Sequence, residues 1–368
     1  MHTRSTIVVG TGVAGASTAF ALSRRGVAVT LVDAELTGQA TAAGAGIIQP
    51  WSSAADGEFY DLYAAGADFY PDLIAQLSDV GVHDIGYRRS GALVVNRDAA
   101  VIDGVEERLA ARRATAASMG EVSRVSAERA RELFPPLGDS FAGIHISGGA
   151  RVDGRVLRAG LLAGAQALGA TVLPGSATVS ATDAGGWTVQ VDGRPVEADA
   201  LVIAAGAWTN SLLEPFGRRI GVEPQRGQIT HLRVGNADTR YWPSVHPVAS
   251  HYLVAFDDSR VAVGATRETG SRFDPRVTAE GQRQVLENAL SVAPGLADAT
   301  LIETRVGLRP LPDGELPTVG ALDGVDGVYV NAGFGAAGLT MGPLVGDLLA
   351  TAVVDQSADS LSRYLSNS

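Results

Sequence analysis

The sequence predicts an α/β protein in which a Rossmann-like dinucleotide-binding domain is joined to a second domain built on an antiparallel sheet. Two observations indicate the first domain: an apolar strand at 5–9 runs into a glycine-rich turn, and a helix at 13–25 and a strand at 27–32 follow it. The third observation is the strand-rich stretch at 224–264, which indicates the second domain. A length of 368 residues suits two connected domains.

The glycine-rich turn has the spacing of a dinucleotide-binding motif. It reads Gly10-Thr11-Gly12-Val13-Ala14-Gly15. In this motif Gly10 permits a tight turn, Gly12 lets a pyrophosphate approach the backbone, and Gly15 lets helix and strand pack closely. The helix N-terminus offers free N–H groups to phosphates. Asp33, at the end of the second strand, suits a ribose diol, but the motif alone does not separate NAD from FAD.

Two loops of small residues, far apart in the sequence, favour FAD. Small residues let a backbone lie against a large flat ligand, and a second helix N-terminus can stabilise negative charge on a reduced flavin. The residues expected at the cofactor in the first loop are Thr41, Ala42, Ala43, Gly44, Ala45 and Gly46. Those in the second loop are Phe334, Gly335, Ala336, Ala337, Gly338, Leu339 and Thr340.

The remaining pattern places further helices and strands along the chain. Helices are expected at 57–80, 100–118, 126–133, 155–169, 278–292 and 339–354. Strands are expected at 91–95, 171–173, 177–181, 187–191, 199–203 and 328–333. We therefore expect a discontinuous FAD-binding domain made of 1–50, 150–210 and 310–368. The segments 51–149 and 211–309 would build the substrate-binding domain.

The composition excludes several classes of chemistry. The chain has no Cys, so disulfides, iron–sulfur clusters and flavin–cysteinyl bonds are impossible. All 29 basic residues are Arg, so no Lys can hold pyridoxal phosphate or complete a Walker A loop. The net charge of −11 disfavours nucleic acid and anionic membranes as partners. With no membrane-length apolar stretch and no signal peptide, we expect a cytoplasmic protein, and the six His show no metal spacing.

A third motif at 303–310 carries two arginines. It reads Glu303-Thr304-Arg305-Val306-Gly307-Leu308-Arg309-Pro310. If this segment is extended, Arg305 and Arg309 share one face with Glu303. A guanidinium can bind a substrate carboxylate with two hydrogen bonds, but spacing alone favours a structural salt bridge.

Further motifs in order along nearly the whole chain support a family resemblance. They are TAAGAG (41–46), YRRSGAL (87–93), VDGR (152–155), AAGAW (204–208), PQRGQ (224–228), HYLV (251–254), VGAT (263–266), GLRP (307–310), LPTVG (316–320) and AGFGAAGLTMGP (332–343). With the glycine-rich turn, they show that the sequence resembles the FAD-dependent D-amino acid oxidase superfamily, most closely its glycine oxidase branch.

The resemblance implies roles for particular residues. Arg309, in GLRP, would bind the substrate carboxylate, and Tyr252, in HYLV, would add a hydroxyl to the same site. The implied flavin contacts outside the two loops are Gly10, Gly12, Val13, Ala14, Gly15, Asp33, Ala34, Thr178, Val179 and Gly206. Relatives that bind flavin covalently use Cys or a His near the first helix. This chain has no Cys, and its only His in the first 80 residues is His2, so we expect noncovalent FAD.

The implied reaction is oxidative deamination of a small amino acid, of the glycine or D-amino acid type. A hydride passes from Cα to flavin N5, and hydrolysis of the imine gives a keto acid and ammonia; oxygen as the acceptor gives hydrogen peroxide. The alternatives are a dehydrogenase that reduces a quinone, an oxidase of N-methyl amino acids or 2-hydroxy acids, an NAD-binding module, or a flavin-binding protein without turnover. A homo-oligomer is possible.

Two arginines depart from the glycine oxidase pattern and bear on the substrate. Arg305 stands in place of an aromatic residue, and Arg267 in place of an apolar one. Arg305 or Arg267 would then accept a polar or anionic part of the substrate. The alternative for Arg305, which the spacing slightly favours, is an ion pair with Glu303 or a nearby acid.

Overall fold

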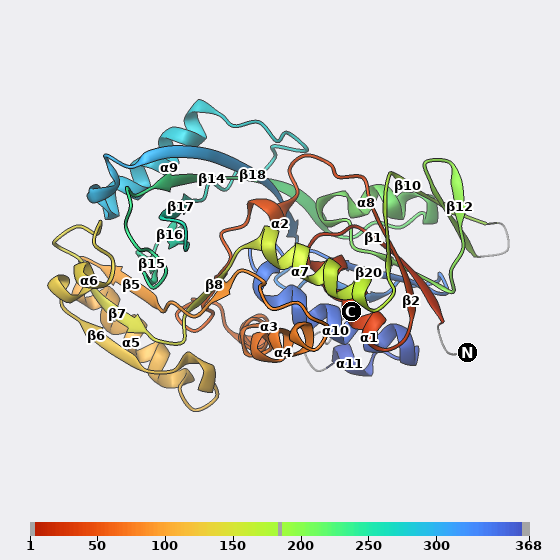
Figure 1. The fold of residues 1–368 in the computed structure, drawn as a ribbon, viewed down its shortest axis with the longest axis horizontal. Helices are drawn as coiled ribbons and strands as arrows, with labels where there is room; N and C mark the ends of the chain where they lie inside the picture. The colour runs from red at the N-terminus through yellow and green to blue at the C-terminus, as the bar shows by residue number, and fades with distance from the viewer. Residues whose placement is uncertain (1–3, 183–185, 363–368) are drawn as a thin grey trace.

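The computed structural model describes residues 4–182 and 186–362 and is organised around two large sheets (Figure 1). The first has six strands in the order β19-β20-β13-β1-β2-β9, all parallel except the edge strand β19. Its strands are β1 (Ser5–Val9), β2 (Ala28–Asp33), β9 (Thr171–Pro174), β13 (Ala200–Ile203), β19 (Thr318–Ala321) and β20 (Val328–Ala332). This is the predicted Rossmann-like sheet, and its central strands β1 and β13 are almost fully buried, as expected for a parallel sheet covered on both faces.

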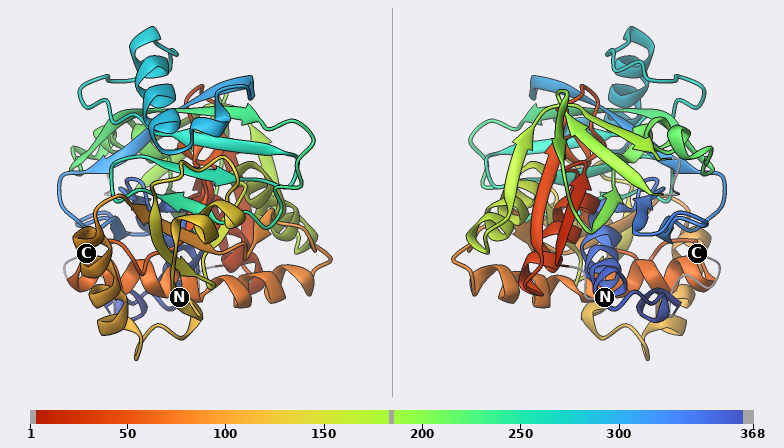
Figure 2. Two further views of the ribbon diagram at one scale, coloured as in Figure 1. Left: turned by 90° about the vertical axis from the view of Figure 1, so that its left-hand side faces the viewer. Right: turned by 90° about the vertical axis from the view of Figure 1, so that its right-hand side faces the viewer.

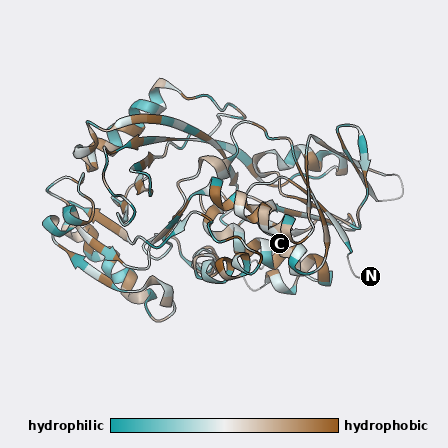
Figure 3. Cartoon of the chain, viewed as in Figure 1, coloured by the Kyte–Doolittle hydropathy of each residue, from teal (hydrophilic) through white to brown (hydrophobic). Residues whose placement is uncertain are grey.

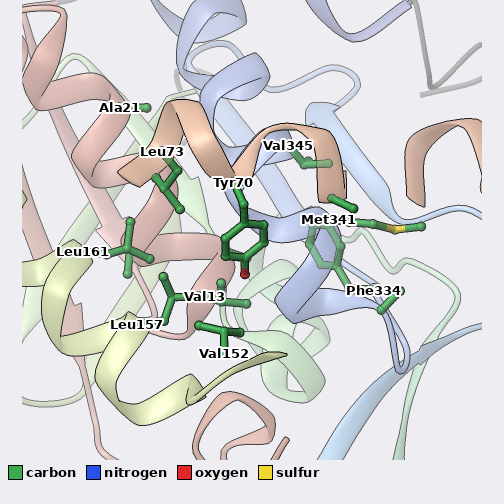
Figure 4. Close-up of a cluster of buried hydrophobic side chains, with 14 of the residues drawn as sticks. Val13, Ala21, Tyr70, Leu73, Val152, Leu157, Leu161, Phe334, Met341 and Val345 are labelled. Carbon is green, nitrogen blue, oxygen red and sulfur yellow. The ribbon is translucent and has the colours of Figure 1, made fainter. Parts of the chain in front are cut away.

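Helices pack closely around this sheet because small residues line their contacts. The main ones are α1 (Val13–Arg24), α7 (Gly154–Ala167) and α10 (Gly338–Asp355). A Cβ at Gly346 would lie 2.7 Å from the Cβ of Ser17, so α10 tolerates only glycine where it meets α1. Val13, Leu157, Met341 and Val345 meet in the core between these helices (Figure 4).

Two further helices pack beside this group, the first against α10 and the second against α7. They are α3 (Gly57–Asp68) and α4 (Tyr70–Ser78), which replace the single helix expected at 57–80. The chain breaks at Phe69 because Pro71 has no N–H to continue the first helix. Within the described residues α10 is long and apolar enough to span a membrane, but 67% of it is buried in this core.

The second large sheet has eight strands in the order β18-β14-β17-β16-β15-β5-β7-β6, paired antiparallel except for β15 with β5. Its strands are β5 (Ala92–Asn96), β6 (Val122–Val125), β7 (Ala142–Ile146), β14 (Val222–Arg233), β15 (Ser244–His246), β16 (Tyr252–Ala255), β17 (Arg260–Gly264) and β18 (Thr300–Pro312). β14 and β18 form one long ladder, with Gln225 opposite Arg309 and Ile229 opposite Arg305. The segment 303–310 is therefore extended, which is the condition under which Arg305 and Arg309 were expected to share one face.

Three helices flank the second sheet. They are α5 (Ala99–Arg112), α6 (Ala127–Leu133) and α9 (Ala279–Val292), and α9 lies over β14 and β17 (Figure 2). Hydrophobic residues follow the interior strands, and hydrophilic residues dominate the outer turns (Figure 3).

Short elements complete the fold. Two three-stranded sheets contain β3 (Ile47–Ile48), β8 (Ala150–Val152) and β4 (Tyr87–Arg88), and β10 (Ala177–Ala181), β11 (Trp187–Val191) and β12 (Arg194–Val196). The short helices are α2 (Ala40–Ala43), α8 (Thr209–Leu213), α11 (Asp359–Ser362), η1 (Ala117–Met119), η2 (Gly206–Trp208), η3 (Glu214–Phe216) and η4 (Pro294–Leu296). Both large sheets draw strands from distant parts of the chain, and the division into two discontinuous domains stays a prediction.

Candidate active site

A cavity of about 500 Å³ is lined by residues of both large sheets. This volume lies within the range of small-molecule and cofactor sites in proteins. The glycine-rich turn and the end of β2 form one part of its wall, and β18, β16 and the loop before α10 form another. The cavity therefore joins segments that lie hundreds of residues apart in the sequence.

The glycine-rich turn requires glycine at two positions for steric reasons. Gly10 has φ of +103°, and a Cβ there would lie 2.3 Å from the carbonyl oxygen of Ala204. A Cβ at Gly15 would lie 1.9 Å from the carbonyl oxygen of Gly10. Gly10, Gly12, Val13 and Ala14 line the cavity, whereas Gly15 lies behind it and allows α1 to approach the turn.

Asp33 lies at the cavity wall with its carboxylate already occupied. One oxygen accepts hydrogen bonds from the N–H and hydroxyl of Thr11, at 2.7 and 2.5 Å. The other accepts from the N–H of Glu35 at 2.6 Å and from the amide of Gln39 at 2.9 Å. Four donors fill the acceptor capacity of a carboxylate. A ribose hydroxyl at Asp33 would therefore have to replace one of them, and Gln39 is the side-chain donor able to rotate away.

The two small-residue loops meet at this cavity, as their use by one cofactor would require. Of the predicted contacts, those that line it are Ala34, Thr41, Ala43, Gly44, Ala45, Gly46, Gly206, Phe334, Gly335, Ala336, Gly338 and Leu339. Ala42 faces a second cavity, and Ala337 and Thr340 lie behind the wall. The Thr340 hydroxyl donates to the carbonyl oxygen of Ile47 at 3.0 Å, so it joins the two loops.

The contacts expected at Thr178 and Val179 are displaced along the chain. Gly175, Ser176 and Ala177 line the cavity instead. β10 turns away from the cavity to pair with β11, which buries Val179 against Val189 and leaves Thr178 exposed. His2 lies outside the described residues.

Arg309 and Tyr252 meet at the part of the cavity formed by the eight-stranded sheet. The Arg309 guanidinium donates hydrogen bonds to the carbonyl oxygen of Thr266 at 3.0 Å, to the amide oxygen of Gln225 at 3.4 Å and to the Tyr252 hydroxyl. A Cβ at Gly227 would lie 2.4 Å from Arg309 Nη2, so the guanidinium lies where only glycine leaves room. Burial lowers the pKa of Arg309 and raises that of Tyr252.

Arg267 follows β17 and lines the same cavity as Arg309. Within residues 4–182 and 186–362, no acidic group forms an ion pair with Arg267 or Arg309 within 4.0 Å. Arg309 is half-buried and Arg267 is exposed. Because a partly desolvated cation without a counter-ion is unfavourable, the space beside Arg309 is suited to bind an anion.

The structure separates Arg305 from Arg309, contrary to their expected shared site. Arg305 pairs with Glu303 at 2.7 Å and lines a second cavity of about 330 Å³ beside Arg155 and Arg158. The two arginines are separated because the segment 38–43 crosses β18 between them. The N–H of Leu308 donates to the carbonyl oxygen of Gly38 at 2.8 Å, and a Cβ at Gly307 would lie 3.0 Å from Ala43 Cβ. The alternative expected for Arg305, an ion pair with Glu303, is therefore the one present.

Several polar residues of the cavity were not expected. They are Gln49, Ser52, Tyr63, His246 and Ser250. His246 Nε2 lies 2.9 Å from the Ser244 hydroxyl, and burial lowers its pKa to about 4, which keeps the imidazole neutral at pH 7. No sequence pattern singles out His246, because the six His have neither triad nor metal spacing. The position of Ser250 just before HYLV was the available signal.

These residues fit FAD. The cavity joins the N-terminus of α1, Asp33 at the end of β2, and a wall of small residues packed closely against β18 at Gly307. Such a surface matches a phosphate, a ribose and a flat ring in one extended ligand. We expect backbone N–H groups of the turn to hold the pyrophosphate and the small-residue loops to hold the flavin ring.

The fold and this cavity define a flavin-dependent oxidoreductase, and the sequence comparison agrees. The chain belongs to the family described as "FAD dependent oxidoreductase", whose model matches residues 5–352, and FAD is its cofactor. The predicted relationship to glycine oxidases is confirmed: glycine oxidase of Pseudomonas aeruginosa is 30% identical, with 94% of this chain and 93% of that protein covered.

Two other proteins are more similar to this chain. The uncharacterized oxidoreductase YurR of Bacillus subtilis is 45% identical, and the match covers 98% of both chains. The crystal structure of iminodiacetate oxidase (IdaA) from Chelativorans sp. BNC1 is 46% identical, with a TM-score of 0.94 and 98% of each chain covered.

Proposed function

We propose that the protein oxidises the carbon next to the nitrogen of a small amino acid, and that it favours substrates with a second carboxylate. The observation that carries this proposal is the pair of arginines, Arg309 and Arg267, that line one cavity without an acidic partner in the described chain. Two cations in one small site suit a dianionic substrate better than glycine.

Arg309 is the proposed anchor of the carboxylate next to the reacting carbon. Its guanidinium is fixed by Thr266, Gln225 and Tyr252, and it lies over Gly227, so it loses little side-chain freedom on binding. The Tyr252 hydroxyl adjoins the same position and can donate to the bound carboxylate. Burial strengthens this charge pair because water competes less for it.

Arg267 is the proposed partner of the second carboxylate. The name of the 46% identical relative states that it oxidises iminodiacetate, a secondary amine with a carboxylate on each arm. The glycine oxidase relatives are named for a substrate with a single carboxylate. The presence of Arg267 and Arg309 in the lining of one cavity supports the dicarboxylate as the better substrate for this chain.

FAD, when bound, would supply the redox chemistry as the acceptor of the hydride that leaves the carbon next to nitrogen with both electrons of the C–H bond. The substrate leaves as an imine, and water cleaves its C=N bond; iminodiacetate would give glyoxylate and glycine. The protein holds both carboxylates so that one C–H bond stays in a fixed orientation. His246 is neutral at pH 7, so it adds no third cation to the site.

Steady-state oxidation of matched substrates tests this proposal. Iminodiacetate and sarcosine differ mainly in the second carboxylate, so the ratio of their kcat/KM values isolates its contribution. Loss of a charged hydrogen bond of ~1.5–3 kcal/mol predicts that Arg267→Ala lowers this ratio roughly 10- to 100-fold. Arg305→Ala is the matched control, because Arg305 is already paired with Glu303 outside the cavity.

An unchanged ratio in Arg267→Ala would overturn the role of the second carboxylate. Glycine, D-alanine and D-aspartate complete the panel and show whether the amine must be secondary. Oxygen uptake with peroxide formation supports the oxidase; reduction of a quinone without oxygen uptake supports the dehydrogenase alternative.

A further inference from the structure

The loop that carries Arg267 is held by a buried arginine outside the cavity. Residues 265–278 connect β17 to α9 and contain no strand or helix of their own. Arg226, on β14, is 11% exposed and donates to Glu268 Oε2 from Nε and Nη2, at 2.9 and 2.6 Å. Its Nη1 donates to Asp274 Oδ2 at 2.7 Å, so one side chain holds the loop at two points.

The backbone of Arg226 strengthens the same attachment. Its N–H donates to the carbonyl oxygen of Glu268 at 3.3 Å, and the N–H of Glu268 donates back at 2.9 Å. The hydroxyl of Ser271 also accepts from the Arg226 N–H, at 3.1 Å. The loop therefore begins as a short pairing with β14, and the residue fixed most firmly is Glu268.

Arg267 is the immediate neighbour of Glu268 and has no comparable attachment of its own. Successive residues of an extended segment point to opposite sides, which places Glu268 at Arg226 and Arg267 in the cavity. Within the described chain no acidic side chain forms an ion pair with Arg267, so its position depends on the backbone that Glu268 holds.

We propose that Arg226 is a positioning residue for Arg267 and thereby sets the preference for a second carboxylate. This inference rests on the proposed function. Arg226 touches neither cavity nor substrate; it acts by keeping the start of the loop against β14. Arg309 depends on it less, because the side chain of Arg309 is also fixed by Gln225 and Tyr252 and rests over Gly227.

A double-mutant cycle with Arg226→Met and Arg267→Met tests this. Misplacement of a binding group can cost up to about 100-fold, so Arg226→Met should raise KM for iminodiacetate about tenfold or more. KM for sarcosine and kcat for both substrates should stay within about twofold. If Arg226 acts through Arg267, the double variant should have the same substrate ratio as Arg267→Met alone.

Two further variants separate positioning from general loss of structure. Arg226→Lys keeps one charge and should restore part of the preference, although Lys cannot hold two carboxylates in a fork. Arg276→Met is the matched control: Arg276 also binds Asp274, at 2.9 Å, but is 79% exposed, so its loss should leave the ratio unchanged.

Hydrogen exchange of holoenzyme supplies a readout independent of substrate. Exchange of the 265–278 amides should increase in Arg226→Met and stay as in wild type in Arg276→Met. An unchanged substrate ratio or unchanged loop exchange in Arg226→Met, or additive effects in the double variant, would overturn the inference while the proposed function stands. A ratio that Arg267→Met does not change would overturn both.

Discussion

At the scale of single residues, the surroundings of each arginine decide what it can do. Arg226 and Arg305 have carboxylate partners at 2.6 and 2.7 Å, and their charges are satisfied within the protein. Arg309 is fixed by neutral acceptors, and Arg267 lines the same cavity. Of these four arginines, Arg226 and Arg305 already have anionic partners, and Arg309 and Arg267 have none within 4.0 Å in the described part of the chain. This difference is why we propose the latter two for the substrate carboxylates.

Replacement of Arg309 by Met should impair substrate binding and spare the cofactor. Leaving a buried carboxylate without its partner costs ~2–5 kcal/mol, which corresponds to a loss of roughly 30- to 4000-fold in kcat/KM. KM should rise steeply for every carboxylate substrate, while the flavin absorbance per protein stays at the wild-type level. Wild-type kinetics in Arg309→Met would show that this arginine is structural only.

His231 should make stability depend on pH. It is 2% exposed, and burial, then the charges of Arg305 and Arg260, lower its pKa to about 3. Because the folded pKa lies below the unfolded value of 6.5, the unfolded chain binds the extra proton. Stability is therefore complete above pH 6.5 and declines as pH falls towards 3.

Urea unfolding at pH 7.5 and 5.5 measures this contribution. One pH unit below the unfolded pKa, the His231 contribution should fall by about 1.4 kcal/mol. His231→Asn removes the titrating group, so its free energy of unfolding should decline less than that of wild type by about this amount. Equal declines in both proteins would show that His231 titrates alike in the folded and unfolded states.

At the scale of elements, helices and turns pack closely where a glycine has no side chain at the contact. α1 meets the glycine-rich turn at Gly15 and meets α10 at Gly346, and in both places a Cβ would collide with backbone or side-chain atoms. These contacts bring the N-terminus of α1 and the loop before α10 to the same cavity. Helix packing is therefore part of what forms the cofactor site.

A pair of glycine substitutions separates this packing role from helix propensity. Gly15→Ala should cost about 3 kcal/mol or more and weaken FAD retention, because its Cβ would lie 1.9 Å from the carbonyl oxygen of Gly10. Gly104→Ala is the matched control: it lies exposed in α5 with nothing within 4 Å of its Cβ. This control should gain roughly 0.5–1 kcal/mol. Thermal unfolding of the two variants compares them, and a tolerated Gly15→Ala would contradict the packing argument.

At the scale of the whole molecule, the cavity connects segments that the chain brings together only on folding. Its wall combines the turn after β1, the segment 39–46, the loop 204–206, β18 and the segment 331–339. A ligand that fills this cavity therefore contacts both large sheets at once. Because the unfolded chain has no such site, FAD binds only the folded protein and raises its free energy of unfolding.

The purified protein should hold FAD tightly and without a covalent bond. Acid precipitation should release flavin into the supernatant, because the chain has no Cys to form a thioether link. The apoprotein should gain about 2.7 kcal/mol of stability at FAD concentrations 100-fold above Kd, and less with AMP or FMN, which fill only one part of the cavity. Flavin that remains in the precipitate would contradict noncovalent binding.

The sequence by itself determined the Rossmann-like unit, most helices and strands, and FAD as the cofactor. The helices, strands and glycine-rich turn depend on local requirements: apolar periodicity and the steric need for glycine at Gly10 and Gly15. FAD was favoured by two small-residue loops and by the family resemblance. Arg309 was also reached from sequence, through the GLRP resemblance, and the structure has it in the cavity.

Only the tertiary structure decided which arginines share a site. Arg305 and Arg309 lie on β18 at a spacing that places both on one face of an extended strand. The segment 38–43, which crosses between them, is more than 260 residues away in sequence. The same holds for Arg226, whose hold on the Arg267 loop depends on ion pairs between β14 and residues 42 and 48 positions away. Side-chain partners across such distances are set by how the sheets pack, and no local pattern encodes them.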